Sequence, residues 1–204
     1  MAPEKSRRNE RVAERRAAIV HASRVVFARN GYTQTLVEDI AEQAGIAKGT
    51  LYLYFRSKEE IYMAVLLEDA RVLDAQTRDR MNAVGTWDQK VRAFLQVRLE
   101  YLDEHEDFLR IYFSEIRSLM LRGAPMQAEL FQVMRDHEEQ LARMFAAAIA
   151  GKEIRSVDPE LAAVTVCDLT HGLIERRLMG WSRTSDRDAA NFLVDILCQS
   201  LAVR

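Results

Sequence analysis

Apolar residues recur at intervals of three and four along most of this chain, which places them on one face of an α-helix. The first such stripe ends before Asn30–Gly31, and its members are Ile19, Ala22, Val26 and Phe27. Similar stripes continue towards the C-terminus, and we see no convincing stretch in which apolar and polar residues alternate as in a half-buried strand. The pattern predicts an all-α fold of about nine helices.

Polar residues with capping chemistry mark several helix starts. Ser or Thr is followed three residues later by Glu, Gln or Asp at 35–38, 57–60, 86–89 and 185–188, and Asp158 precedes Pro159. The predicted helices are one ending at Asn30–Gly31, short ones from Thr35 and from about Ala47, and longer ones at 57–82, from 86 past 102, across 109–120, at 125–151, at 158–180 and from 185.

Composition narrows the class of protein. The 204 residues include 8 Gly and 3 Pro, too few turn residues for the many short strands of a sandwich or barrel. A hydrophobic content of 49% excludes wholesale disorder. The longest apolar run, 144–150, is too short to span a bilayer, and no apolar segment follows the charged N-terminus. With Cys167 and Cys198 in apolar helical segments, we expect reduced thiols in a cytoplasmic protein without a membrane partner.

Charge is unevenly distributed, although the net charge is only −2. Residues 1–60 hold 11 Lys and Arg against 8 Asp and Glu, whereas residues 61–204 hold 18 against 23. A basic first part on an acidic remainder is typical of a module that meets a polyanion. A solvated basic arm is the alternative.

Residues 35–55 have the pattern of a helix-turn-helix. Small Ala41 lies on the inner face of the first short helix, where it lets a second helix approach closely, and Gly45 can adopt the positive φ of the turn. In this motif the N-terminal residues of the second helix meet base edges in the major groove. Here these residues are Lys48, Gly49 and Thr50.

Position 49 is unusual because glycine within a helix lowers helix stability by about 1 kcal/mol relative to Ala. Close approach of the backbone to DNA would explain it, and a local packing need is the alternative. The hydroxyls of Tyr52 and Tyr54 and the ammonium of Lys58 are suitable donors to phosphate oxygens. Core packing is the alternative for the tyrosines, but with a spacing of two they cannot share one helix face.

These residues and their neighbours resemble the N-terminal signature of the TetR family of bacterial transcriptional regulators. The resemblance covers about residues 15–65 and rests on Phe27, Gly31–Tyr32, Thr35, Val37–Ala41, Ala44–Tyr52, Tyr54–Phe55 and Ser57–Glu60. It implies a homodimeric repressor that binds a palindromic operator and is released by a small-molecule inducer, which we expect to be hydrophobic. Tyr54 stands where many members carry His, and Leu53 stands where some members use an aromatic or polar side chain for contact.

The resemblance also implies which residues contact DNA, namely Thr35, Lys48, Gly49, Thr50, Tyr52, Tyr54 and Lys58. Those at 48–50 would read bases and the others would contact the backbone, with Thr35 also capping the second helix. We therefore expect a basic disordered arm at residues 1–10, a DNA-binding domain at 11–56, and a ligand-binding and dimerisation domain at 57–204.

The larger domain carries no motif for a particular ligand. Polar residues on apolar stripes, Arg98 and His137, are the most informative, because a buried charge or imidazole needs a partner. The candidate pocket residues are Phe94, Arg98, Tyr101, Tyr112, Phe113, Met134, His137, Asp168 and His171. Ordinary core packing is the alternative for most of them, and a satisfied structural hydrogen bond for Arg98 and His137.

The eighth predicted helix carries Asp168, His171 and Glu175 on one face, with Cys167 four residues before His171. No second cluster of His or Cys completes a ligand set, so we expect no metal and no other cofactor. Gly172, in mid-helix, would let a partner helix come close. We expect the last two helices to form a four-helix dimer interface, with Leu161, Val164, Gly172, Phe192, Leu193 and Ile196.

Other classes of function fit the sequence less well. It contains no Gly-rich phosphate loop and no Ser/His/Asp or Cys/His set on predicted loops, so we do not expect an enzyme. A helical interaction protein without DNA binding is one alternative. A regulator that activates, or that responds to no small molecule, is another.

Overall fold

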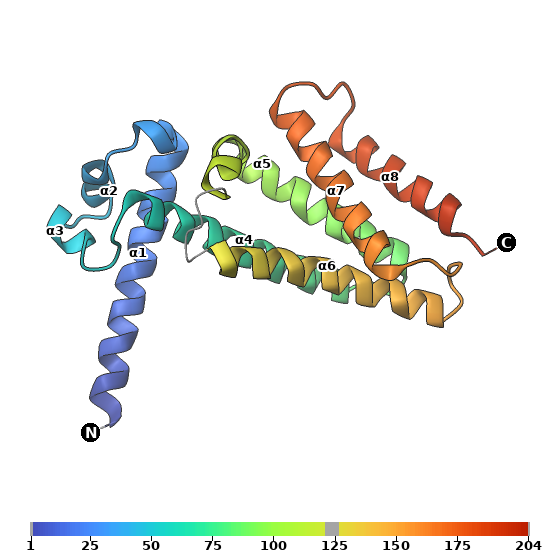
Figure 1. Cartoon of the computed structure of the whole chain (residues 1–204), viewed down its shortest axis with the longest axis horizontal. Helices are drawn as coiled ribbons and strands as arrows, with labels where there is room; N and C mark the ends of the chain where they lie inside the picture. The colour runs from blue at the N-terminus through green and yellow to red at the C-terminus, as the bar shows by residue number, and fades with distance from the viewer. Residues whose placement is uncertain (1, 121–126, 204) are drawn as a thin grey trace. The chain divides into compact units, whose positions relative to one another are not determined.

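The computed structural model describes residues 2–120 and 127–203, with the side chains of 7–106, 109, 113 and 128–203. Within these residues the chain forms α-helices and no strand, so the all-α prediction is confirmed (Figure 1). The elements are α1 (Ala2–Gln34), α2 (Val37–Gln43), α3 (Lys48–Leu51), α4 (Lys58–Asn82), α5 (Trp87–Met120), α6 (Gln127–Ala150), α7 (Pro159–Leu178) and α8 (Asp186–Leu201).

The described residues contain eight helices where the pattern predicts about nine. The fifth and sixth predicted helices are one element, α5, interrupted at His105 by a non-helical conformation with φ −133° and ψ 28°. The two hydrophobic stripes are therefore separated by a kink within one helix, not by a loop between two helices. No Gly or Pro stands between 87 and 120 to end the helix outright.

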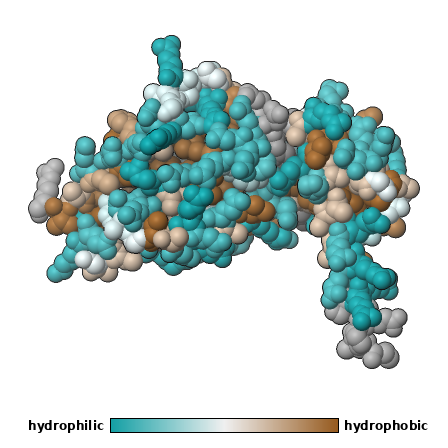
Figure 2. Space-filling view, turned by 180° about the vertical axis from the view of Figure 1, so that it is seen from behind, coloured by the Kyte–Doolittle hydropathy of each residue, from teal (hydrophilic) through white to brown (hydrophobic). Residues whose placement is uncertain are grey.

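The N-terminus differs from the prediction of a disordered arm over residues 1–10. In the structure α1 begins at Ala2 and continues through these positions. Pro3 falls in the first turn, where a missing N–H is tolerated, and the Arg and Glu residues that follow favour helix. Figure 2 shows the N-terminal turns of α1 as a hydrophilic projection, and residues 7–15 are exposed.

Several predicted caps are present. The Asp158 carboxylate accepts from the backbone N–H groups of Glu160 and Leu161 at 2.9 and 3.0 Å, directly before Pro159 at the first position of α7. Ser185 accepts from the N–H of Asp188 at 3.1 Å, and Ser57 accepts from the N–H of Glu60 at 3.1 Å. These bonds satisfy donors that a helix start leaves free.

The chain divides into two compact units, with a boundary inside α4 rather than at residue 57. Unit 1 comprises Met1–Asp69 and Arg110–Ala128, and unit 2 comprises Ala70–Leu109 and Glu129–Arg204. The buried core of unit 1 includes Ile19, Phe27, Ile40, Leu51, Phe55, Ile61 and Tyr62. That of unit 2 includes Val91, Phe94, Leu95, Leu141, Phe145, Val166, Leu193 and Val194. Among the described residues no helix is long and apolar enough to cross a membrane.

Candidate nucleic-acid interface and ligand site

The turn between α2 and α3 has the geometry that the sequence predicts. Gly45 adopts φ +63°, and the N–H of Ile46 donates to the carbonyl of Ala41 at 3.0 Å, which closes the end of α2. Ala41 on α2 is buried, as the predicted close approach of α3 requires, and Leu51 of α3 is fully buried. The two short helices are thus fixed by packing on one side and leave the start of α3 in solvent.

Lys48 lies at this exposed start and has an acidic partner. Its Nζ donates to Oε1 of Glu38 on α2 at 2.5 Å, and both side chains are about half exposed. The hydrogen bond from Lys48 lowers the pKa of the Glu38 carboxyl, and the same bond raises the pKa of Lys48. An exposed pair of this kind is cheap to open, so Lys48 can exchange Glu38 for another acceptor.

Gly49 has open space around it. A Cβ placed on this glycine would meet no heavy atom within 4 Å, and its φ is not positive. The local packing alternative is therefore wrong for this chain. Glycine costs helix stability here without a gain inside the protein, which favours close approach of an external partner.

Thr35 does not have the predicted role. It is 1% exposed, and its hydroxyl donates to the carbonyl of Gly31 at 2.7 Å, at the end of α1. The N-cap residue of α2 is Leu36, whose N–H donates to the carboxylate of Asp39 at 3.1 Å. Burial of the Thr35 hydroxyl against α1 removes it from any phosphate in this structure.

Lys58 is likewise turned inward. Its Nζ donates to the carbonyls of Tyr32 at 2.7 Å, Thr33 at 3.2 Å and Thr35 at 2.9 Å, and lies 4.7 Å from the centre of the Tyr32 ring. An ammonium has three N–H donors, and all three are used here. Lys58 therefore caps the C-terminus of α1 rather than offering a free donor to a phosphate.

The remaining predicted contacts stay accessible to different degrees. Thr50 and Tyr54 are half-buried, whereas Tyr52 is 45% exposed. The sequence did not single out Leu36 as a contact and left Leu53 without a role, yet they are 60% and 81% exposed, at the N-cap of α2 and just after α3. Their exposure is notable because large apolar residues are usually buried.

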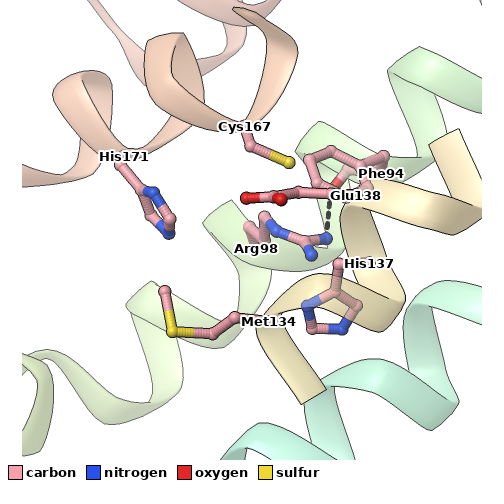
Figure 3. A pocket seen from close by; sticks show the side chains of 7 residues that line it. All are labelled: Phe94, Arg98, Met134, His137, Glu138, Cys167 and His171. Atoms are coloured by element: carbon pink, nitrogen blue, oxygen red, sulfur yellow. Dashed lines mark hydrogen bonds between the residues drawn. The ribbon is translucent and has the colours of Figure 1, made fainter. Parts of the chain in front are cut away.

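A small cavity lies in unit 2, among α5, α6 and α7 (Figure 3). Its volume is about 30 Å³, room for one or two water molecules. The lining residues are Phe94, Arg98, Met134, His137, Glu138, Cys167 and His171. Five of these belong to the predicted set. Glu138 was not predicted, and Cys167, noted only for its spacing from His171, was not assigned to the pocket.

Arg98 is central to this cavity and is 6% exposed. Its Nη1 donates to Oγ1 of Thr77 at 3.1 Å and to the carbonyl of Phe94 at 3.2 Å, and its guanidinium lies 3.3 Å from the centre of the Phe94 ring (Figure 3). Burial lowers the pKa of Arg98 to about 9, so the group is still charged near neutral pH.

Two neighbouring titratable groups, His137 and Cys167, are neutral at that pH. Burial, followed by the positive charge of Arg98, lowers the pKa of His137, although its Nε2 lies 3.1 Å from a carboxylate oxygen of Asp74. Burial also raises the pKa of the Cys167 thiol to about 11. His171 lies on an exposed position of α7, at the edge of the group in Figure 3.

Of the other predicted pocket residues, Tyr101, Phe113 and Asp168 do not line the cavity. Tyr101 is buried in the core of unit 2 beside the ring of His105, and Asp168 is exposed on α7. Phe113 belongs to unit 1. The side chain of Tyr112 lies outside the described residues.

The predicted dimer face is mostly uncovered in the single chain. Leu161 and Phe192 are 66% and 67% exposed, and Ile196 and Val164 are 47% and 37% exposed. A Cβ on Gly172 would meet no atom within 4 Å, so nothing inside the chain requires glycine there. Leu193 is the exception, since it is 6% exposed within the core of unit 2. Neighbours in a helix point in different directions, which turns Leu193 inward beside an outward Phe192.

Comparisons with known proteins match both units. Residues 19–65 match the bacterial regulatory proteins of the tetR family, and residues 84–175 match the tetracyclin repressor-like C-terminal domain. The fatty acid metabolism regulator protein of Bacillus subtilis (strain 168) is 25% identical over 80% of this chain and 81% of its own length. The HTH-type transcriptional regulator RutR of Escherichia coli (strain K12) is 26% identical over 76% and 71%.

Solved structures have the same fold. The transcriptional regulator FadR from Bacillus subtilis, in complex with stearoyl-CoA, aligns with a TM-score of 0.74 at 23% identity, over 89% of this chain and 96% of that chain.

Proposed function

The chain belongs to the TetR family of bacterial transcriptional regulators, and from this premise we propose how its two units act as a ligand-responsive repressor. It binds operator DNA as a homodimer and is released by a small molecule. The proposal places DNA binding in unit 1, with Lys48, Gly49 and Thr50 reading bases and Tyr52 and Tyr54 contacting phosphates. The observation that carries it is the exposed start of α3, where a glycine without internal contacts stands beside a lysine in an exposed, easily opened pair.

The proposed dimer face lies on α7 and α8. Their exposed apolar residues, Leu161, Val164, Phe192 and Ile196, form a surface that a single chain leaves in water. A two-fold axis through this face presents two copies of α3, which matches a palindromic operator. The protein would act in the cytoplasm, where the chromosome lies.

The ligand enters unit 2. Phe94 and Met134 line its cavity, which supports an amphiphilic or apolar small molecule, and a related regulator was solved with stearoyl-CoA. The present volume of about 30 Å³ is far below the roughly 300–1,000 Å³ of typical ligand sites. Binding therefore requires side chains around the cavity to move, which provides a route to a conformational response.

Helix α4 connects that response to DNA binding, because it contributes residues to both units. Its Thr77 accepts a hydrogen bond from Arg98, and its Asp74 lies beside His137. Both Arg98 and His137 line the cavity. The first residue of α4, Lys58, donates a hydrogen bond to the carbonyl of Tyr32 near the end of α1. A ligand that changes the contacts of Thr77 would shift α4 and with it the spacing of the two reading helices.

A fluorescence-anisotropy titration with the DNA upstream of the chain's own gene tests the proposal. We expect binding that is selective over a scrambled duplex of equal length and that weakens as salt rises. Equal, weak binding to both duplexes at all salt concentrations would instead support a helical interaction protein.

A further inference from the structure

Among the residues whose side chains are described, Arg98 is a buried cation with no counter-ion within 4.0 Å. Its two hydrogen-bond acceptors, the hydroxyl of Thr77 and the carbonyl of Phe94, are neutral. Among the described residues no ion pair within 4.0 Å involves its guanidinium, whereas other arginines such as Arg24 and Arg177 pair with carboxylates. A charge that is removed from water and not paired is costly. The cavity next to it is where a compensating anion can bind.

We propose that Arg98 binds the carboxylate of an apolar monocarboxylic acid, and that this acid is the ligand to which the protein responds. The inference rests on the proposed function for the existence of a ligand, and it adds the ligand's chemical class. A guanidinium offers parallel N–H donors that match the two oxygens of a carboxylate.

The charges around the cavity favour a monoanion over a phosphate. Arg98 supplies one positive charge, and His137 and Cys167 supply none near neutral pH because burial disfavours their charged forms. Glu138 adds a carboxylate to the same lining, as Figure 3 shows. With Arg98 and Glu138 both counted, a bound carboxylate leaves one excess negative charge in the lining, whereas a doubly charged phosphate would leave two.

The same reasoning disfavours a ligand that inserts only a hydrocarbon end. A terminal methyl group placed against Arg98 would displace water from the guanidinium and supply no acceptor. A carboxylate-sized group fits the scale of the cavity, about 30 Å³. The rest of an apolar acid would contact Phe94 and Met134, and the flexible thioether of Met134 can adapt to it.

Calorimetric titration with octanoate and with octanamide tests the proposal, because the two differ in charge at nearly constant shape. We expect octanoate to bind and octanamide to bind about tenfold or more weakly. In Arg98→Met this preference should disappear, and Arg98→Lys should retain part of it. Arg143→Met is the matched control, since Arg143 is an exposed arginine on α6 that pairs with Glu139.

The stability of ligand-free Arg98→Met provides a second measurement. Thr77 donates its own hydroxyl to the carbonyl of Leu73 at 2.6 Å, so it keeps a partner when Arg98 is removed. We expect the variant to unfold at the same denaturant concentration as the wild type or at a higher one, because a buried unpaired charge is lost. A strongly destabilised variant would show that Arg98 is a structural residue and overturn the assignment.

Other outcomes are equally decisive. Equal binding of octanoate and octanamide, absence of octanoate binding, or Arg98-dependent binding of coenzyme A without octanoate would each overturn the carboxylate assignment. Operator binding is measured separately in the anisotropy titration, without any ligand. Loss of the proposed function is therefore distinguishable from loss of this inference.

Discussion

Two cations, one in each unit, contrast in environment. Lys48, at the start of α3, is half exposed and pairs with Glu38. Arg98, in the cavity of unit 2, is 6% exposed, and the acceptors that the described residues offer it are neutral oxygens. Lys48 gains little from its ion pair, because water would solvate it in any case. Arg98 is buried, so an anionic partner would stabilise it far more.

The contrast separates two ways of preparing a binding site. A solvated ion pair holds Lys48 near its working position and opens at little cost when DNA arrives. A buried unpaired charge makes the ligand-free state costly, so that an anion gains affinity from relieving it. Lys58 shows a third arrangement, in which three carbonyls use every donor and leave none for DNA.

Replacing Lys58 should have the largest effect, and on stability. Lys58→Met keeps much of the aliphatic side chain but removes three hydrogen bonds to the end of α1, so the free energy of unfolding should fall by about 2 kcal/mol. Chemical denaturation measures this change. The salt dependence of operator binding should keep its slope; a decrease of about 0.9 in that slope would show that Lys58 contacts a phosphate after all.

Replacing Lys48 tests the exposed one of the two cations. Lys48→Ala should reduce the preference for operator over scrambled DNA by about tenfold, because a base contact is lost. Glu38→Gln is the matched variant, since it removes the partner of Lys48 and should tighten binding to both duplexes. If Lys48→Ala weakens binding to operator and scrambled DNA alike, the lysine contacts backbone and reads no base.

Lowering the pH tests the environment of the buried groups around Arg98. His137 has a pKa that burial and Arg98 lower from 6.5, so below about pH 6.5 the unfolded chain binds a proton that the folded chain does not. The free energy of unfolding should therefore decrease as pH falls, by about 1 kcal/mol between roughly pH 7 and 5.5. Asp74 and Arg78 of α4 and His171 of α7 also face or surround this imidazole.

Denaturation of wild type and His137→Gln at both pH values isolates that contribution. The variant should lose less stability on acidification. Parallel pH profiles would mean that Asp74 compensates the protonated imidazole fully.

Gly49 and Gly172, which lie at the proposed interfaces and have no internal contacts, should give the smallest effects, below about 1 kcal/mol. Gly49→Ala should stabilise the chain slightly and weaken operator binding, while dimerisation stays unchanged. Gly172→Ala should instead weaken dimerisation, which sedimentation experiments measure, and leave the start of α3 unchanged. Gly45 provides the control, since at φ +63° an Ala is strained and should destabilise the fold. Wild-type operator affinity in Gly49→Ala would contradict close backbone approach.

Much of the fold was predictable because its signals are local. Spacings of three and four residues identify helices, and Asp158 and Ser185 cap α7 and α8 as their sequence context indicates. The kink at His105 replaced a predicted helix boundary, since the sequence holds no breaker there. Two local predictions differ from the structure: α1 begins at Ala2, because helix-forming side chains outweighed the lack of a cap, and Leu36 rather than Thr35 is the N-cap of α2.

The candidate sites were predictable only in part. Arg98 and His137 were recognisable as polar residues on apolar stripes, and the cavity contains both. Tyr101 lies on α5 and Asp168 on α7, two helices that border the cavity, but neither residue lines it. A single sequence indicates which helix face is apolar, but it does not indicate which part of that face borders a cavity.

By itself, then, the sequence determined the helical fold, the turn at Gly45 and the family, and it predicts that the residues at the start of α3 read bases. Only the tertiary structure showed which side-chain donors already have hydrogen-bond acceptors within the protein. Thr35 and Lys58 turn towards carbonyls of α1, and Arg98 meets Thr77 rather than a carboxylate. Helix formation depends on residues a few positions apart, whereas the partner of a charged side chain is supplied by whichever distant segment packs against it.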